Sequence, residues 1–268
     1  MRAFVVAHRT TRRAVTWLAA FVLVAGAVDR VAAQLAVDQV ELFLDPHAAG
    51  RAGGVRSFNV SNESDHLVEA TLYLNDWDRD ETGENRFSAS GHLPQSCGRY
   101  LRVFPLSLRL PPHTYQAVRV ALEGADSLRQ ACWSVLFVES SAPQQARGRA
   151  ITYVTRLGVK IYAVPANLAK DGEIENVELS DSTVRSVIVS FHNSGEVPLW
   201  PHGGVEFRRL DGSVAAKVPI EEFPTLPGSV RRLAIAVPKL PRGRYIALAL
   251  IDYGGQDIAG GQVQLEVP

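Results

Sequence analysis

Hydrophobic and polar residues alternate along most of this chain in short runs, the pattern of β-strands with one buried and one solvated face. Clusters of Gly, Pro, Asn, Asp and Ser separate these runs, with a spacing of about ten residues. No run has a helical repeat of useful length. The pattern therefore predicts an all-β protein. In the first half, strands are expected at residues 37–44, 55–60, 67–74, 100–110, 115–122, 132–139 and 150–162.

Two polar, turn-rich segments of the first half, 75–98 and 140–148, are expected to be loops. Pro105 interrupts the strand expected over 100–110. Because proline has no N–H for a ladder hydrogen bond, we expect the chain to kink or to change sheets there.

The second half repeats this pattern after a short segment, 165–172, that begins with Pro165 and ends with Gly172. We interpret that segment as a linker. The sequence thus predicts two tandem immunoglobulin-like β-sandwich domains, at 34–165 and 173–268. Strands of the second are expected at 177–179, 184–192, 205–209, 214–219, 230–237, 245–252 and 262–267.

The strand expected over 150–162 is the unusual one, because usual strands have about five or six residues. Ile151, Tyr153, Thr155 and Leu157 fall on one face, and Lys160 falls on the other. A strand that outruns its sheet exposes unpaired backbone groups to which another chain can add. Two interpretations stay open at this point: an ordinary last strand of a sandwich, or an edge that pairs with a second chain.

The first 33 residues have the features of a secretory signal peptide. Arg9, Arg12 and Arg13 precede an uncharged apolar run at 14–28, and small residues ending at Ala33 suit a cleavage site before Gln34. The run is shorter than the about 20 residues that a membrane span needs. We therefore expect a cleaved signal and an exported protein; an uncleaved membrane anchor is the alternative.

Charge argues against nucleic acid as a partner. The whole chain has 28 basic and 28 acidic residues, and removal of the signal, with its five Arg and one Asp, leaves 23 and 27. No basic tract interleaved with aromatic residues is present.

Cys97 and Cys132 are the two cysteines of the chain. In an exported protein such a pair suggests a disulfide, here closing a loop of about 35 residues. Two buried thiols are the alternative.

No catalytic or metal-binding motif is recognisable. None of the seven histidines has metal-ligand spacing to another His or Cys. The acidic run from Asp76 to Glu81 lacks the glycine of a calcium loop at its sixth position. There is no Gly-x-Ser-x-Gly elbow and no phosphate-binding glycine loop. We expect no enzyme activity, cofactor, metal or small-molecule substrate.

Five short segments of the first half form a family-like series: VRSFNVSN at 55–62, LRVFP at 101–105, LRLPP at 108–112, QAVRV at 116–120, and GVKIY at 158–162, which Pro165 follows closely. In order and spacing, they resemble the N-terminal domain of the periplasmic pilus-assembly chaperones, the PapD-like family. The second half of the chain matches that family less well.

The resemblance implies a periplasmic chaperone that caps pilin-like subunits, whose β-sandwich lacks a strand, by donor-strand complementation. It implies that Ile151, Tyr153, Thr155 and Leu157 face this client. It also implies that Lys160 anchors the client's terminal carboxylate. An outer-membrane usher would be a further partner, and a second copy of the chain could cover the same edge.

The family's partner arginine for that lysine is missing, because the first strand ends in Leu44-Asp45-Pro46-His47. The alternative function is a non-enzymatic module of the cell envelope that keeps the fold without pilin clients.

Overall fold

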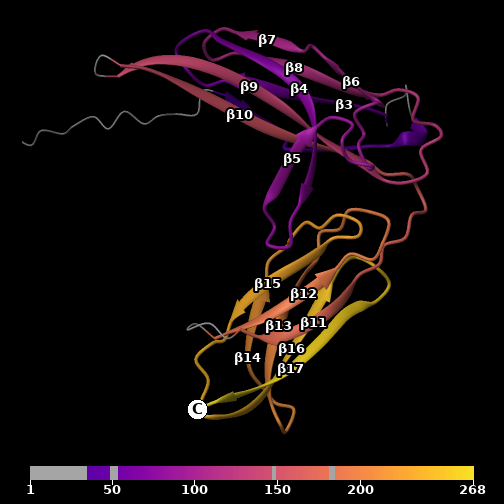
Figure 1. Ribbon diagram of the computed structural model, residues 1–268, viewed down its shortest axis with the longest axis vertical. Helices are drawn as coiled ribbons and strands as arrows, with labels where there is room; N and C mark the ends of the chain where they lie inside the picture. The colour runs from indigo at the N-terminus through magenta and orange to yellow at the C-terminus, as the bar shows by residue number, and fades with distance from the viewer. Residues whose placement is uncertain (1–34, 49–53, 147–148, 181–184) are drawn as a thin grey trace, which may run out of the picture. The chain divides into compact units, whose positions relative to one another are not determined.

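The computed structural model describes residues 35–48, 54–146, 149–180 and 185–268, with the backbone alone over 142–146 and 149–152 (Figure 1). The described chain is built from β-strands, with one short 3-10 turn, η1 (Pro46–Ala48), so the expected all-β class is confirmed. The expected signal peptide lies outside the described residues. No helix among the described residues is long and apolar enough to cross a membrane.

Two sheets form the first sandwich. One has the spatial order β1 (Leu35–Val37), β3 (Val55–Asn62), β8 (Tyr115–Leu122), β6 (Leu101–Phe104). The other has the order β2 (Glu41–Leu44), β10 (Arg149–Ala163), β9 (Cys132–Ala146), β4 (Val68–Arg79), β5 (Asn85–Ala89), and β7 (Ser107–Leu110) also pairs with β4.

Inward-facing side chains of both sheets make the core of this sandwich. Phe58 and Val120 from one sheet, and Leu136 and Ile161 from the other, are almost fully buried. This is the arrangement that alternating apolar residues predict when one face of each sheet is removed from water.

The strand predicted at 37–44 is two strands in the structure, which corrects that expectation. β1 pairs with β3, whereas β2 pairs in parallel with β10 in the opposite sheet. At the crossing, Asp38 accepts hydrogen bonds from the backbone N–H and the side-chain amide of Asn59, at 2.8 Å each. The sheet change expected at Pro105 is confirmed, since β6 and β7 belong to different sheets.

The expectation of a loop at 75–98 is wrong for its first part, where β4 continues to Arg79 and forms a hairpin with β5. Trp77 faces Phe87 across this hairpin and is 1% exposed. At the turn, one carboxylate oxygen of Asp80 accepts hydrogen bonds from the backbone N–H groups of Thr82, Gly83 and Glu84. An acidic turn therefore caps a hairpin there.

Cys97 and Cys132 are joined by a disulfide. Cys132 is the first residue of β9, and Cys97 lies in the segment that follows β5. Both cysteines are buried in the core of the first sandwich.

The second sandwich also has two sheets, and both are antiparallel throughout. One has the order β11 (Glu173–Leu179), β12 (Ser186–His192), β15 (Val230–Ala236); the other has the order β14 (Val214–Ile220), β13 (His202–Arg209), β16 (Gly243–Asp252), β17 (Ile258–Val267). Its core includes Val189 and Phe191 from the first sheet and Phe207 and Ala249 from the second. Each strand predicted in this half is present, with shifted ends.

Candidate functional site

The longest elements of the chain, β9 and β10, form one antiparallel hairpin of fifteen residues on each side. β4 pairs with β9 only over Val135–Glu139, so residues 140–146 of β9 and their partners in β10 run on beyond β4 as a two-stranded ribbon (Figure 1). The loop expected at 140–148 is therefore wrong over 140–146, which is strand. Its residues pair with the start of β10.

β10 has a free edge along most of its length. On the side away from β9, its partner is β2, and that pairing covers only Lys160 to Ala163. Among the described residues, no strand pairs with this side of β10 before Lys160. Such an edge is a template for another strand.

The residues whose backbone groups face this edge follow from the pairing. The N–H of Lys160 donates to the carbonyl oxygen of Val40 at 2.8 Å, on the side of β2. Backbone direction alternates along a strand, and the register with β9 is unbroken. The N–H and C=O groups of Val154, Arg156 and Gly158 therefore point to the free edge, whereas those of Thr155 and Leu157 point to β9.

Along one face of β10, the side chains become more exposed from Val159 to Tyr153. Val159 is fully buried, Leu157 packs partly buried against the same core, and Tyr153 is 55% exposed. Thr155, between them, is half-buried. The side chain of Ile151 lies outside the described residues. The structure thus places Tyr153, Thr155 and Leu157 on one face, in a row that the sandwich itself does not fully cover.

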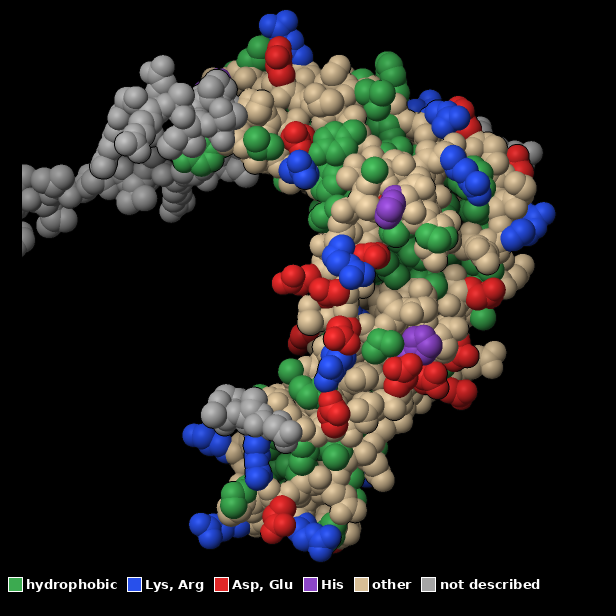
Figure 2. All heavy atoms as spheres, in the orientation of Figure 1, with side chains coloured by type: hydrophobic (Ala, Val, Ile, Leu, Met, Phe, Trp, Pro, Cys, Tyr) green, Lys and Arg blue, Asp and Glu red, His purple; other side chains and the backbone are tan. Residues whose placement is uncertain are grey.

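The opposite face of the same sheet carries aromatic and charged side chains. Phe137 packs against Tyr73 and Phe87, with ring centroids 5.6 and 5.0 Å away. Glu139 accepts hydrogen bonds from Tyr73 Oη and Arg156 Nε, which lower the pKa of this carboxyl. Figure 2 shows hydrophobic side chains between scattered charges of both signs on the visible face of the first sandwich.

Lys160 lies on this second face, opposite in direction to Tyr153, and no register shift occurs at Gly158. Its side chain is 19% exposed. Its Nζ lies 4.5 Å from the ring centroid of Trp77 and 4.0 Å from Oε1 of Glu41. Burial, and secondarily the positive charge of Arg79, lower the pKa of Lys160, whereas Glu41 opposes the shift.

Arg79 is the residue of this site that sequence reasoning missed. Its guanidinium carbon lies 5.8 Å from the ring centroid of Trp77, so the indole contacts two cations. Among the described residues, no partner accepts a hydrogen bond from its buried Nε. The available signal was the spacing of Trp77 and Arg79, which puts both on one face only if 75–79 is a strand.

The first strand supplies no arginine near Lys160; β2 instead places Glu41 directly opposite it in the ladder. Glu41 also accepts a hydrogen bond from Tyr162 Oη at 3.4 Å. Lys160, Arg79 and Glu41 together carry a net positive charge; the two cations contact the buried ring of Trp77, and Glu41 lies beside Lys160. This arrangement suits an anion better than a cation.

The lowered pKa of Lys160 has a consequence for stability. The folded protein binds this proton less tightly than the unfolded chain does, so at neutral pH the charged lysine costs folding free energy. We expect Lys160→Met to leave the free energy of unfolding equal or higher at pH 7, measured by urea denaturation. The difference from wild type should shrink as pH rises through the lysine pKa. A clear loss of stability at pH 7 would contradict this account of the site.

No protein-family model matches the chain, and no curated protein matches its sequence. Among solved structures, the class 5 fimbriae chaperone CfaA is 14% identical, over 87% of this chain and 99% of its own, with a TM-score of 0.49.

The E. coli chaperone DraB is 14% identical over 87% of this chain and 96% of its own, with a TM-score of 0.43. A chain of the CsuC–CsuE chaperone–tip adhesion subunit pre-assembly complex of Acinetobacter baumannii is 8% identical over 86% and 98%, with a TM-score of 0.45. The chain is thus similar to solved structures of fimbrial chaperones and their complexes.

Proposed function

We propose that this protein is a periplasmic, non-enzymatic chaperone that binds pilin-like subunits with an incomplete β-sandwich and lends them the edge of β10. The observation that carries the proposal is the free edge before Lys160, on a strand that outruns its own sheet. Adding a strand to such an edge satisfies the backbone groups of both chains. The resemblance of the sequence to the PapD-like family motivates the choice of client.

In this proposal the backbone and the side chains of β10 have separate roles. The outward N–H and C=O groups of Val154, Arg156 and Gly158 form the ladder with the client strand. Tyr153 and Leu157, with Ile151 and Thr155, occupy the groove that the missing strand leaves in the client. Backbone pairing supplies affinity that is independent of the client's sequence, and the side chains select a groove that fits them.

Lys160 and Arg79 are the proposed anchor for a carboxylate at the end of the client chain. A bound carboxylate would accept charge-assisted hydrogen bonds from the ammonium group of Lys160 and the guanidinium group of Arg79. In this role Arg79 replaces the arginine that the first strand lacks. Glu41 stays beside Lys160, so that the free protein does not carry two uncompensated cations there.

The groove-filling role is tested with Tyr153→Asp. A charge placed in an apolar groove loses its hydration, so we expect capture of the client to be lost in a pull-down from the native cell envelope. The matched control is Tyr115→Asp, because Tyr115 is a tyrosine of similar exposure, 71%, on a strand of the other sheet. Equal capture by both variants would contradict the proposed use of this face.

The anchor is tested with Lys160→Met, for which Lys239→Met is the control because Lys239 is an exposed lysine of the second sandwich. A hydrogen-bonded charge pair contributes about 1.5–3 kcal/mol. We therefore expect Lys160→Met to bind the client about ten- to a hundredfold more weakly, although its free energy of unfolding is equal to or higher than that of wild type. An unchanged affinity for the client would exclude Lys160 as its anchor.

A second copy of the chain is the competing occupant of the edge. If the purified protein is a dimer and Tyr153→Asp makes it a monomer, with no subunit captured from the envelope, the edge serves self-association. The protein would then be a cell-envelope module that keeps the fold without a pilin client.

A further inference from the structure

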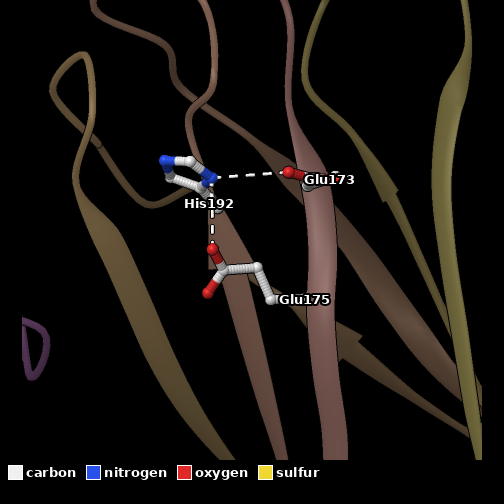
Figure 3. A group of neighbouring side chains, drawn as sticks. All are labelled: Glu173, Glu175 and His192. Carbon is white, nitrogen blue, oxygen red and sulfur yellow. Dashed lines mark ion pairs between the residues drawn. The ribbon is translucent and has the colours of Figure 1, made fainter.

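Three side chains of the second sandwich meet around one ring nitrogen. The Nδ1 atom of His192 lies 3.5 Å from Oε1 of Glu173 and 3.2 Å from Oε1 of Glu175 (Figure 3). The three potential ligand atoms lie within 4.8 Å of one another. His192 ends β12, whereas both glutamates belong to β11, at the edge of the same sheet.

The pairing of the two strands explains how both carboxylates reach the same nitrogen. Glu173 is directly opposite His192 in the ladder. The register then shifts between Ile174 and Asn176, so that Glu175 is the extra residue of a β-bulge. A bulge re-aims a side chain without ending the strand. Figure 3 shows the outcome, with the two carboxylates approaching the same ring nitrogen from different directions.

The nitrogen at the centre of this cluster has no conventional partner. Nδ1 of His192 is buried, and no hydrogen bond to it meets normal geometry among the described residues. Its distances to the two carboxylate oxygens are instead close to the distances between two ligand atoms that bind the same metal ion. Zn–N and Zn–O bonds of about 2.0–2.1 Å at a tetrahedral angle separate two ligand atoms by about 3.3 Å.

We propose that His192, Glu173 and Glu175 bind a divalent transition metal ion of the Zn²⁺ type. One imidazole nitrogen and two carboxylate oxygens are a ligand set that Zn²⁺ accepts, with the fourth position left for water. The nitrogen ligand favours such an ion over Mg²⁺ or Ca²⁺, which prefer oxygen. The glutamate side chains are 63% and 43% exposed, so an ion can enter from solvent.

A bound ion would join the edge strand β11 to β12 and neutralise two adjacent carboxylates. The competing explanation is an ion pair between a protonated His192 and the two glutamates, without any metal. Only the metal site makes stability depend on Zn²⁺, because an ion that binds the folded state alone raises the unfolding temperature with its concentration.

The test is calorimetric titration of the purified, chelator-treated protein with ZnCl₂, together with thermal unfolding with and without the ion. The variants are His192→Gln and Glu175→Gln. The control is Glu178→Gln, because Glu178 is a glutamate of the same strand that pairs with Arg232 instead. A second control is His202→Gln, which removes an exposed histidine of the same sandwich.

We expect wild type and both controls to bind one Zn²⁺ and to unfold at a higher temperature with it. His192→Gln and Glu175→Gln should bind at least about tenfold more weakly and lose the thermal shift. Absence of Zn²⁺ binding by wild type, or equal binding by Glu175→Gln, would overturn the proposal. Glu175 is exposed in a bulge, so Glu175→Gln should fold. This variant therefore tests the proposal even if His192→Gln fails to fold.

Discussion

Arg156→Pro is expected to prevent β10 from pairing with a client strand while leaving the hairpin with β9 intact. The N–H of Arg156 faces the free edge, because the N–H of Lys160, four residues on, donates to Val40 on that side. Proline removes this donor and places its ring where the client backbone would lie. The hydrogen bonds between β9 and β10 are all kept, because the N–H of Arg156 does not point to β9. Proline is tolerated in a strand where the lost N–H faces solvent.

The control for this variant is Arg156→Ala, which keeps the N–H but loses the ion pair with Glu139. That pair is solvent-exposed and should contribute little. A client carbonyl left unpaired in the new interface costs about 1–3 kcal/mol. We therefore expect binding about ten- to a hundredfold weaker for Arg156→Pro than for Arg156→Ala, measured with the purified client. Equal affinities would mean that the edge of β10 does not form the interface.

Removal of the disulfide is the change with the largest expected effect on stability. Cys97 and Cys132 are 35 residues apart, and closing a loop of that length in the unfolded chain corresponds to about 3–4 kcal/mol in the chain-entropy model. The double variant Cys97→Ala/Cys132→Ala should lose about that much free energy of unfolding. The measurement is urea denaturation followed by tryptophan fluorescence, to which Trp77 and Trp133 of the first sandwich and Trp200 of the second contribute.

The second sandwich provides an internal control for this prediction, because it contains no cysteine. Any unfolding transition that belongs to it alone should stay at the same urea concentration. Reduction of the wild-type protein should reproduce the double variant. If oxidised and reduced wild type unfold at the same urea concentration, the disulfide does not stabilise the first sandwich as argued.

Most strands of both sandwiches could be predicted because burial of one face imposes a period of two on the sequence. This is clearest for β10, where the row from Tyr153 to Leu157 continues the buried face of Val159. The sheet change at Pro105 was also predictable, since proline cannot donate to a ladder. These inferences need only local sequence and the chemistry of the backbone.

The hairpin of β4 and β5 was not predictable in the same way. Its strands are rich in Asn, Asp and Arg, and Asp76 is buried because it accepts hydrogen bonds from Leu93 N and Ser96 Oγ. A polar residue satisfied by tertiary partners looks like a loop residue in the sequence. Arg79 was missed as a consequence, because it lies near Lys160 only if β4 continues as a strand to residue 79.

The cluster around His192 shows a different limit of sequence reasoning. Glu173 and Glu175 precede the histidine by 19 and 17 residues and lie on another strand. Such a separation matches no local metal motif. The bulge at Glu175 brings the second carboxylate to Nδ1, and a bulge is a feature of pairing that neither strand reveals alone.

The most direct test of donor-strand pairing is amide hydrogen exchange of the protein alone and in complex with a co-purified envelope subunit. In the free protein, the amides of Thr155 and Leu157 should be protected by β9, whereas those of Val154, Arg156 and Gly158 should exchange fast. In the complex, the account predicts that these three become protected as well. If they exchange equally fast in the complex, the client binds elsewhere and β10 does not lend its edge.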